Sequence, residues 1–195
     1  MTSAQAPSRS RILAAAAERV VAEGVAGASM QSVADAAGVS KGLVHYHFDD
    51  RETLLAAVVT HLADEVVGRE RRALRGVSAA GAVDALWIWL DAELVRGVMR
   101  ALVELASAPE PRVREAARHA HSRRCAAAAE TADALFTALA LRPRVPATMI
   151  AEVTVAFTDG LAVRATLDPR SPQHRAPNPR VAFDVFWLAM LGLAE

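Results

Sequence analysis

A short segment around residue 45 gathers side chains that are able to bind nucleic acid. Lys41 is the only lysine of the chain, and Tyr46 and His47 carry hydrogen-bond donors. Groups of this kind contact the phosphate oxygens of DNA, and a lysine also contacts the acceptor edge of guanine. Gly42 has no side chain, which allows a partner to approach the backbone closely. The segment therefore predicts a DNA-binding surface.

Two short helices joined by a tight turn would hold this segment in place. Ser29 and Ser40 are good N-cap residues for helices that begin directly after them. Gly38 can take the left-handed conformation that ends the first of these helices. The pattern predicts a helix-turn-helix over about residues 29–48, whose second helix would enter the major groove.

The helical period decides which side chains of the second helix would face outward. Val44 and Phe48 are apolar and suit the inner face. At about 100° per residue, Gly42 and Tyr46 then point directly away from the core. The residues on the two flanks of this outward face are Leu43 and His45. The face that is free to meet a partner thus carries the groups that suit DNA.

The rest of the chain also has the character of a helical protein. It is 53% hydrophobic but only 5% aromatic, and its apolar residues recur three or four positions apart. We therefore expect an all-α fold, in which residues 1–8 form a loose tail. Apart from the helix-turn-helix, helices are expected at about 10–24, from Asp49-Asp50 to beyond 66, and at 82–106, 112–141, 147–167 and 180–194.

The run SMQSVADAAGVSKGLVHYHFDDRETLL at residues 29–55 resembles the DNA-binding domain of the TetR (tetracycline-repressor-like) family of bacterial transcription regulators. The matches include the AGVSKG turn and the YHF triplet after it, and the similarity covers roughly residues 9–68. Three positions depart from the family pattern: Leu43 stands where Thr is common, His45 where Tyr is common and Arg51 where Lys is common. Because Leu43 lacks a hydroxyl, it would contact a thymine methyl group or pack within the domain.

The resemblance implies roles for individual residues. Phosphate contacts are expected from Ser29, Tyr46, His47 and Arg51. The residues expected nearest the base edges are Lys41, Gly42, Leu43 and His45, and Ser40 and Gln31 complete the expected contact set. Two of these have an alternative role, since His47 could instead be tied to the start of the next helix and Gln31 could simply be solvated.

The resemblance also implies an organisation and a mode of action. Residues 9–68 would form an N-terminal three-helix helix-turn-helix DNA-binding domain, and residues 69–195 a C-terminal helical domain for ligand binding and dimerisation. We expect a cytoplasmic repressor, nucleoid-associated when bound, that binds an inverted-repeat operator in double-stranded DNA as a homodimer. A small-molecule effector of unknown identity would release it.

The last two helices give independent support for a dimer. The segments 147–167 and 180–194 are apolar nearly all round, and a helix without a polar face should be buried on both sides. One side would pack on its own domain and the other on a second copy, in a twofold four-helix interface. The residues expected there are Val153, Phe157, Leu161, Val181, Val185, Phe186 and Met190. The alternative is that both helices are internal to a monomer.

An effector pocket is expected where a polar side chain lies among apolar residues. In the helix at 82–106, a stripe with Glu93 and Arg100 suits a solvated face, whereas Asp91 lies off that stripe near apolar residues. A carboxylate in such surroundings needs a partner, either another side chain or a cationic or hydroxylated ligand. The residues expected at the pocket are Trp87, Asp91, Met99, His121, Phe136 and Phe157. For the aromatic residues and Met99 the alternative is a place in the apolar core.

Other functions receive little support from the sequence. No phosphate-binding glycine loop, metal-spaced Cys/His cluster or catalytic triad is evident, so we expect neither an enzyme nor a metal or cofactor. The longest late apolar run has ten residues, half of the roughly 20 needed for a membrane span, so no membrane partner is expected. The formal net charge is zero, which makes DNA affinity depend on a few well-placed cations and on the dimer. The alternatives are a protein-controlled DNA-binding protein of the same fold and a helical-bundle enzyme.

Overall fold

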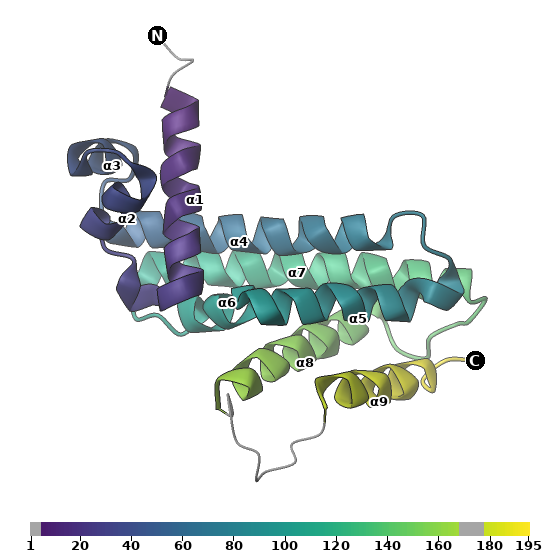
Figure 1. Ribbon diagram of the computed structural model, residues 1–195. Helices are drawn as coiled ribbons and strands as arrows, with labels where there is room; N and C mark the ends of the chain where they lie inside the picture. Colours follow the sequence, from purple (N-terminus) through teal and green to yellow (C-terminus); the bar gives the residue numbers. More distant parts are fainter. Residues whose placement is uncertain (1–4, 168–177) are drawn as a thin grey trace. The chain divides into compact units, whose positions relative to one another are not determined.

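The computed structural model describes residues 5–167 and 178–195, and these form α-helices linked by short turns (Figure 1). The helices are α1 (Gln5–Glu23), α2 (Met30–Ala37), α3 (Lys41–His47), α4 (Arg51–Leu74), α5 (Ala79–Arg96), α6 (Val98–Ala106), α7 (Pro111–Ala138), α8 (Ala147–Leu167) and α9 (Pro179–Leu191), with a 3-10 turn η1 (Val25–Gly27) after α1. The predicted all-α class is confirmed. Among the described helices, none combines the length and the apolar character needed to cross a bilayer.

The first helix begins earlier than the sequence indicates. A loose tail is expected over residues 1–8, but α1 already includes Gln5 and Pro7. A proline is tolerated in the first turn of a helix because the backbone N–H groups there have no partner within the helix. The prediction was therefore wrong for residues 5–8, while residues 1–4 lie outside the described part of the chain.

The single helix expected over 82–106 is two helices separated by Gly97. Gly97 has a φ of 78°, a left-handed conformation that an α-helix cannot continue through. A β-carbon at this position would lie 3.6 Å from the carbonyl oxygen of Val21, at the end of α1. The break ends α5, and α6 beyond it packs against α1.

The described chain forms two compact units that are interleaved in sequence. The first unit contains the residues up to Glu65 together with Arg96–His121, and the second contains Val66–Val95 and Ser122 onward. The domain boundary expected from the sequence, at residue 68, lies close to the division between Glu65 and Val66 inside α4. The expected division nevertheless assigned residues 96–121 to the second domain, whereas the turn at Gly97 returns them to the first.

Each unit has an apolar core of its own. In the first unit the fully buried side chains come from every helix, with Ile12, Val20, Val33, Ala34, Val44, Leu54 and Leu105 at 0% exposure. The small Ala34 lies in α2, which packs against both α1 and α3. In the second unit Phe136 of α7 packs with Ile150 of α8, and Leu90 of α5 is fully buried.

The second unit also buries charged groups. Glu93 of α5 is 0% exposed, and Arg69 of α4 donates to both of its carboxylate oxygens, with Nε–Oε1 at 2.6 Å and Nη2–Oε2 at 2.9 Å. The sequence assigned Glu93 to a solvated face and Asp91 to apolar surroundings. Both assignments were wrong, because Asp91 is exposed and Glu93 faces α4.

Candidate nucleic-acid interface

The turn between α2 and α3 is built by local interactions. Gly38 has a φ of 63° and ends α2, and its N–H and that of Val39 donate to the last carbonyls of that helix. Ser40 then caps α3, because its hydroxyl accepts a hydrogen bond from the N–H of Leu43 at 3.2 Å. These two short helices form the predicted helix-turn-helix.

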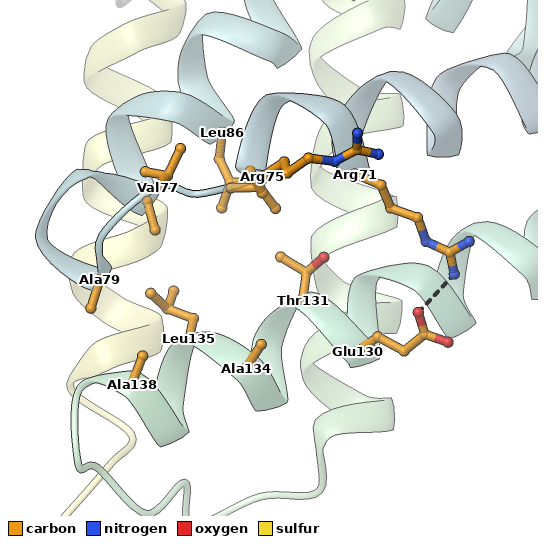
Figure 2. Close-up of a pocket in the computed structure, with 12 residues that line it drawn as sticks. Arg71, Arg75, Val77, Ala79, Leu86, Glu130, Thr131, Ala134, Leu135 and Ala138 are labelled. Carbon is orange, nitrogen blue, oxygen red and sulfur yellow. Dashed lines mark hydrogen bonds and ion pairs between the residues drawn. The ribbon is translucent and has the colours of Figure 1, made fainter.

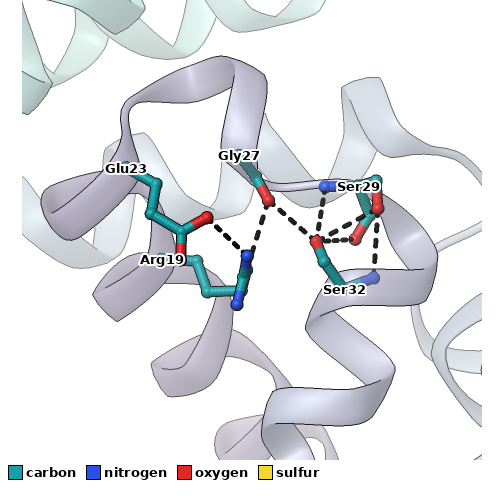
Figure 3. Close-up of polar contacts among 5 residues, drawn as sticks. All are labelled: Arg19, Glu23, Gly27, Ser29 and Ser32. Carbon is teal, nitrogen blue, oxygen red and sulfur yellow. Dashed lines mark hydrogen bonds and ion pairs between the residues drawn. The ribbon is translucent and has the colours of Figure 1, made fainter.

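The start of α2 is fixed by a set of polar contacts (Figure 3). The Ser29 hydroxyl accepts from the N–H of Ser32, and the Ser32 hydroxyl accepts from the N–H of Ser29, both at 3.0 Å. Ser32 also donates to the carbonyl of Gly27, which accepts a second hydrogen bond from Arg19 of α1. These contacts satisfy the orphan N–H groups at the helix start and join α1 to α2 through the η1 turn.

The exposed face of α3 has the orientation that the helical period predicts. Val44 is 0% exposed and Phe48, which caps the helix, is 1% exposed. Tyr46 is 65% exposed on the opposite face, and the other exposed residues of the helix are Lys41, Gly42 and His45. A β-carbon at Gly42 would meet only the Ser40 hydroxyl within 4 Å, so a partner has open access to the backbone there.

The remaining predicted contact residues differ in their exposure and in their hydrogen-bond partners. Leu43 is only half-buried, and His47 lies edge-on to the Tyr46 ring with a buried Nε2 that has no partner among the described residues. The alternative role of His47, a tie to the next helix, is thus not among the described contacts. Gln31 is exposed and donates to Asp35 at 2.8 Å, one turn further along α2.

Arg51 has a different environment from the one expected for a phosphate contact. Its Nε donates to the carbonyl of Ala28 at 2.9 Å, and its Nη2 donates to the carbonyl of Val25. Its Nη1 forms an ion pair with Glu110, just before α7. The guanidinium is therefore occupied within the first unit, where it joins the start of α4 to the η1 turn. It has little donor capacity left for DNA.

Further contacts join the helix-turn-helix to α6 and the start of α7. Glu104 of α6 accepts from the N–H of Val25 at 2.7 Å, and Glu52 of α4 accepts from the N–H of Arg112 at 2.7 Å. Asp50 caps α4 by accepting from the N–H of Thr53, and this hydrogen bond is the main cause that lowers the pKa of the Asp50 carboxyl. The position of η1 and of the start of α4, on either side of α2 and α3, is thus held by α6 and α7 within this unit.

One cation near α3 has no role in the sequence-based prediction. The guanidinium carbon of Arg9, in the second turn of α1, lies 4.8 Å from the centroid of the Phe48 ring. This cation–π contact holds an exposed charge beside the end of α3. The sequence shows an arginine there, but only the packing of α1 against α3 indicates where it lies.

Residues 12–58 match the family model described as bacterial regulatory proteins, tetR family. This range covers α1, η1, α2, α3 and the start of α4, the elements whose geometry is given above. This part of the chain, residues 12–58, is therefore a tetR-family domain.

Individual relatives agree with this TetR-family assignment. The transcriptional regulator BetI of Ectopseudomonas mendocina is 42% identical over 69 residues, which cover 34% of this chain and 35% of that protein. The chain thus matches only about a third of the length of such curated relatives. A transcriptional regulator from Rhodococcus sp. Rha1 has a similar structure, with a TM-score of 0.73 at 26% identity, over 95% of this chain and 97% of that one. A TetR-family regulator from Rhodococcus sp. shares the fold with a TM-score of 0.76 at 21% identity, over 96% and 98% of the two chains.

The six residues predicted for an effector pocket lie in different environments. None of them lines the pocket of the second unit that is described below. Asp91 and His121 are exposed, Met99 belongs to the core of the first unit, and Phe136 to that of the second. Trp87 contacts the ring of Phe183, and Phe157 stacks on Phe186. The aromatic residues are therefore used for packing between helices.

A pocket of about 560 Å³ lies instead within the second unit (Figure 2). It is bounded by the last turns of α4 and α7 and the first turns of α5. The residues that line it are Arg71, Leu74, Arg75, Val77, Ala79, Ala82, Leu86, Glu130, Thr131, Ala134, Leu135 and Ala138. Most are apolar and many are alanines, which carry no individual signal in a sequence so rich in alanine. Sequence reasoning missed this pocket for that reason.

A buried carboxylate lies next to the pocket. Glu70 of α4 is 8% exposed and accepts a hydrogen bond at 2.9 Å from Thr131, which lines the pocket. Burial raises the pKa of the Glu70 carboxyl, although the Thr131 hydrogen bond acts in the opposite direction. Arg71 forms an ion pair at 2.7 Å with Glu130, and both side chains are well exposed.

The last two helices of this TetR-family chain present an apolar surface. Val153, Val181 and Val185 are 44%, 52% and 60% exposed, and Phe157, Phe186 and Met190 are half-buried. Leu161 is only 7% exposed, because it packs inside its own unit, so its assignment to a dimer interface was wrong. The structure adds further exposed apolar residues, namely Met149, Val163 and Leu188.

Proposed function

We propose that this TetR-family chain is a DNA-binding transcriptional regulator, a repressor that binds an inverted-repeat operator as a homodimer. The observation that carries the proposal is the exposed face of α3, which carries Lys41, Gly42, His45 and Tyr46. The Ser40 cap fixes the start of this helix, and the Gly38 cap ends α2 before it. A helix of this kind fits the major groove. Since its partner is chromosomal DNA, we place the protein in the cytoplasm.

The contacts divide into two groups. Lys41 and His45 would lie nearest the base edges, and Gly42 would allow the backbone of α3 to approach them. Tyr46 would donate to a phosphate. Arg9 joins this second group, because the Phe48 ring holds its guanidinium beside α3. Arg51 is not used in this proposal, since its donors are occupied.

The dimer would form through α8 and α9. The exposed residues of α8 include Met149, Val153 and Val163, and those of α9 include Val181, Val185 and Leu188. The α9 residues are spaced four and then three positions apart, which places them on one stripe of the helix. An exposed apolar stripe on two neighbouring helices supports a twofold four-helix interface with a second copy.

Effector control would act through the two long helices. Both α4 and α7 begin in the first unit and end in the second, where their last turns line the pocket. A ligand that fits the pocket only when these turns are displaced would favour a conformation in which the two recognition helices are wrongly spaced. Only such a difference in affinity between the two conformations can release DNA. In this role the protein needs no catalysis, metal or cofactor.

The test is a titration of the protein with an operator duplex selected from random DNA, followed by fluorescence anisotropy. We expect an inverted repeat with half-site centres roughly 34–36 Å apart, or a multiple of this. Lys41→Ala should weaken binding to the selected operator by about tenfold or more and relax the sequence preference at the base pair that Lys41 contacts. Arg72→Ala, which removes an exposed charge of α4, is the control.

The same assay tests the dimer. Val185→Glu places a carboxylate in the apolar stripe and should give monomers in light scattering that bind the operator weakly. Equal affinity of Lys41→Ala and Arg72→Ala would overturn the assignment of α3 as the recognition helix. Full-strength binding by a monomeric Val185→Glu protein would overturn the dimer.

A further inference from the structure

We infer that the pocket at the ends of α4 and α7 binds an amphipathic organic anion, a molecule with an apolar body and one carboxylate or sulfate group. That this ligand is also the effector rests on the proposed function. The chemical class of the ligand does not, because it follows from the residues that line the pocket.

The size and lining of the pocket favour an apolar body. A volume of about 560 Å³ falls in the range of pockets that enclose small organic ligands. Eight of the twelve lining residues are apolar, and Leu86 and Leu135 at the inner wall are each only 4% exposed. The room arises because four of the lining residues are alanines, Ala79, Ala82, Ala134 and Ala138, where a larger side chain would fill the space.

The charges around the pocket favour an anion. Arg71 of α4 and Arg75, directly after α4, line it, and Figure 2 shows them across the pocket from Ala134, Leu135 and Ala138 of α7. The Arg71 charge is balanced by Glu130. Arg75 is exposed and has no acidic partner among the residues that the structure describes. The lining therefore carries one uncompensated positive charge, and a guanidinium binds a carboxylate or sulfate through paired hydrogen bonds.

The two acidic groups near the pocket do not provide a comparable binding site for a cation. Glu130 is already paired with Arg71, and Glu70 is buried and accepts a hydrogen bond from Thr131. Burial also raises the pKa of Glu70, which favours its neutral form. A cationic ligand would have to displace Arg71 while lying near Arg75, so the electrostatics oppose it.

The experiment is a calorimetric titration of the full-length protein with three ligands that share one tail. The probes are decanoate, decyltrimethylammonium and 1-decanol, each below its aggregation concentration. We expect decanoate to bind most tightly, 1-decanol more weakly and decyltrimethylammonium weakest. Equal binding of the three, or preference for the cation, would overturn the inference.

Two pairs of variants locate the ligand. Arg75→Gln should weaken decanoate binding by about tenfold while leaving 1-decanol unchanged. Arg72→Gln is the matched control, because Arg72 is an exposed arginine in the last turn of α4, three residues before Arg75, and does not line the pocket. Ala134→Leu should abolish binding of all probes, whereas Ala126→Leu, at an exposed position of α7 outside the pocket, should not. If Ala134→Leu does not fold, Ala82→Leu fills the pocket from the α5 side.

The outcomes separate the ligand class from its regulatory role. Loss of decanoate binding in Arg75→Gln but not in Arg72→Gln would support the anion site, and equal loss in both would overturn it. Operator affinity is measured in parallel with and without decanoate. Decanoate that binds at Arg75 yet leaves operator affinity unchanged would overturn control of DNA binding through this pocket, while the anion site would stand.

Discussion

The Arg69→Met substitution would leave the Glu93 carboxylate buried without the guanidinium that balances its charge. Glu93 is 0% exposed, and Arg69 contacts both of its oxygens, at 2.6 and 2.9 Å. Removing one partner of a buried ion pair destabilises a protein by about 3–5 kcal/mol. The Arg69 side chain is 22% exposed, so water can reach one end of the pair and the lower value is expected.

A decrease of about 3 kcal/mol in the free energy of unfolding predicts a fall in Tm of roughly 6–12 °C for a chain of this length. Thermal unfolding is followed by circular dichroism at one protein concentration, because dimerisation would make Tm depend on concentration. Arg71→Met is the matched control, since its ion pair with Glu130 is exposed and should contribute at most about 1 kcal/mol. The double substitution Arg69→Met with Glu93→Leu should recover most of the stability, because no charge then remains buried. A Tm of Arg69→Met equal to that of Arg71→Met would refute the reasoning.

Two further predictions concern buried ionisable groups. Burial raises the pKa of Glu70 above its usual 4.5, so the folded state binds a proton that the unfolded state has already lost, and the stability due to this group falls as pH rises through the raised pKa. Glu70→Gln should therefore be more stable than the parent at pH 7, by about 1.4 kcal/mol for each pKa unit by which the Glu70 pKa is raised, and as stable as the parent below pH 4.5. Denaturant titration at both pH values measures the two free energies of unfolding. A stability difference that does not depend on pH would contradict the prediction. Burial, aided by Glu152, also raises the pKa of the Cys125 thiol to about 11. Iodoacetamide at pH 8 should then alkylate it at least two orders of magnitude more slowly than a free cysteine, and a rate equal to that of the unfolded protein would show that the thiol is neither buried nor protonated.

The helix-turn-helix could be predicted from the sequence because its determinants are local. Ser29, Gly38 and Ser40 act on backbone groups within a few residues, and these contacts are present in the structure. The inner and outer faces of α3 follow from the helical period alone, with Val44 buried and Tyr46 exposed. Features of this kind need no knowledge of what packs against the helix.

The features that were missed all depend on contacts between residues far apart in the chain. Arg51 has the charge and the place of a phosphate contact, but its partners Ala28 and Glu110 are 23 and 59 residues away. Glu93 and Asp91 were assigned to the wrong environments because Arg69, which pairs with Glu93, lies on another helix, 24 residues away in the sequence. The pocket is lined by residues of α4, α5 and α7, four of them alanines, which no spacing rule brings together.

Zero net charge now has a more specific consequence for DNA binding. In the helices that would approach DNA, Arg19 forms an ion pair with Glu23, and Arg51 is occupied by internal partners. Among the described residues of this region, Arg9, Arg11 and Lys41 remain without an acidic partner. Each phosphate that such a cation neutralises contributes little binding free energy by itself. One subunit should therefore bind DNA weakly, and two linked subunits far more strongly. An effector that changes the spacing of the two recognition helices would therefore remove much of the binding free energy without touching a DNA contact.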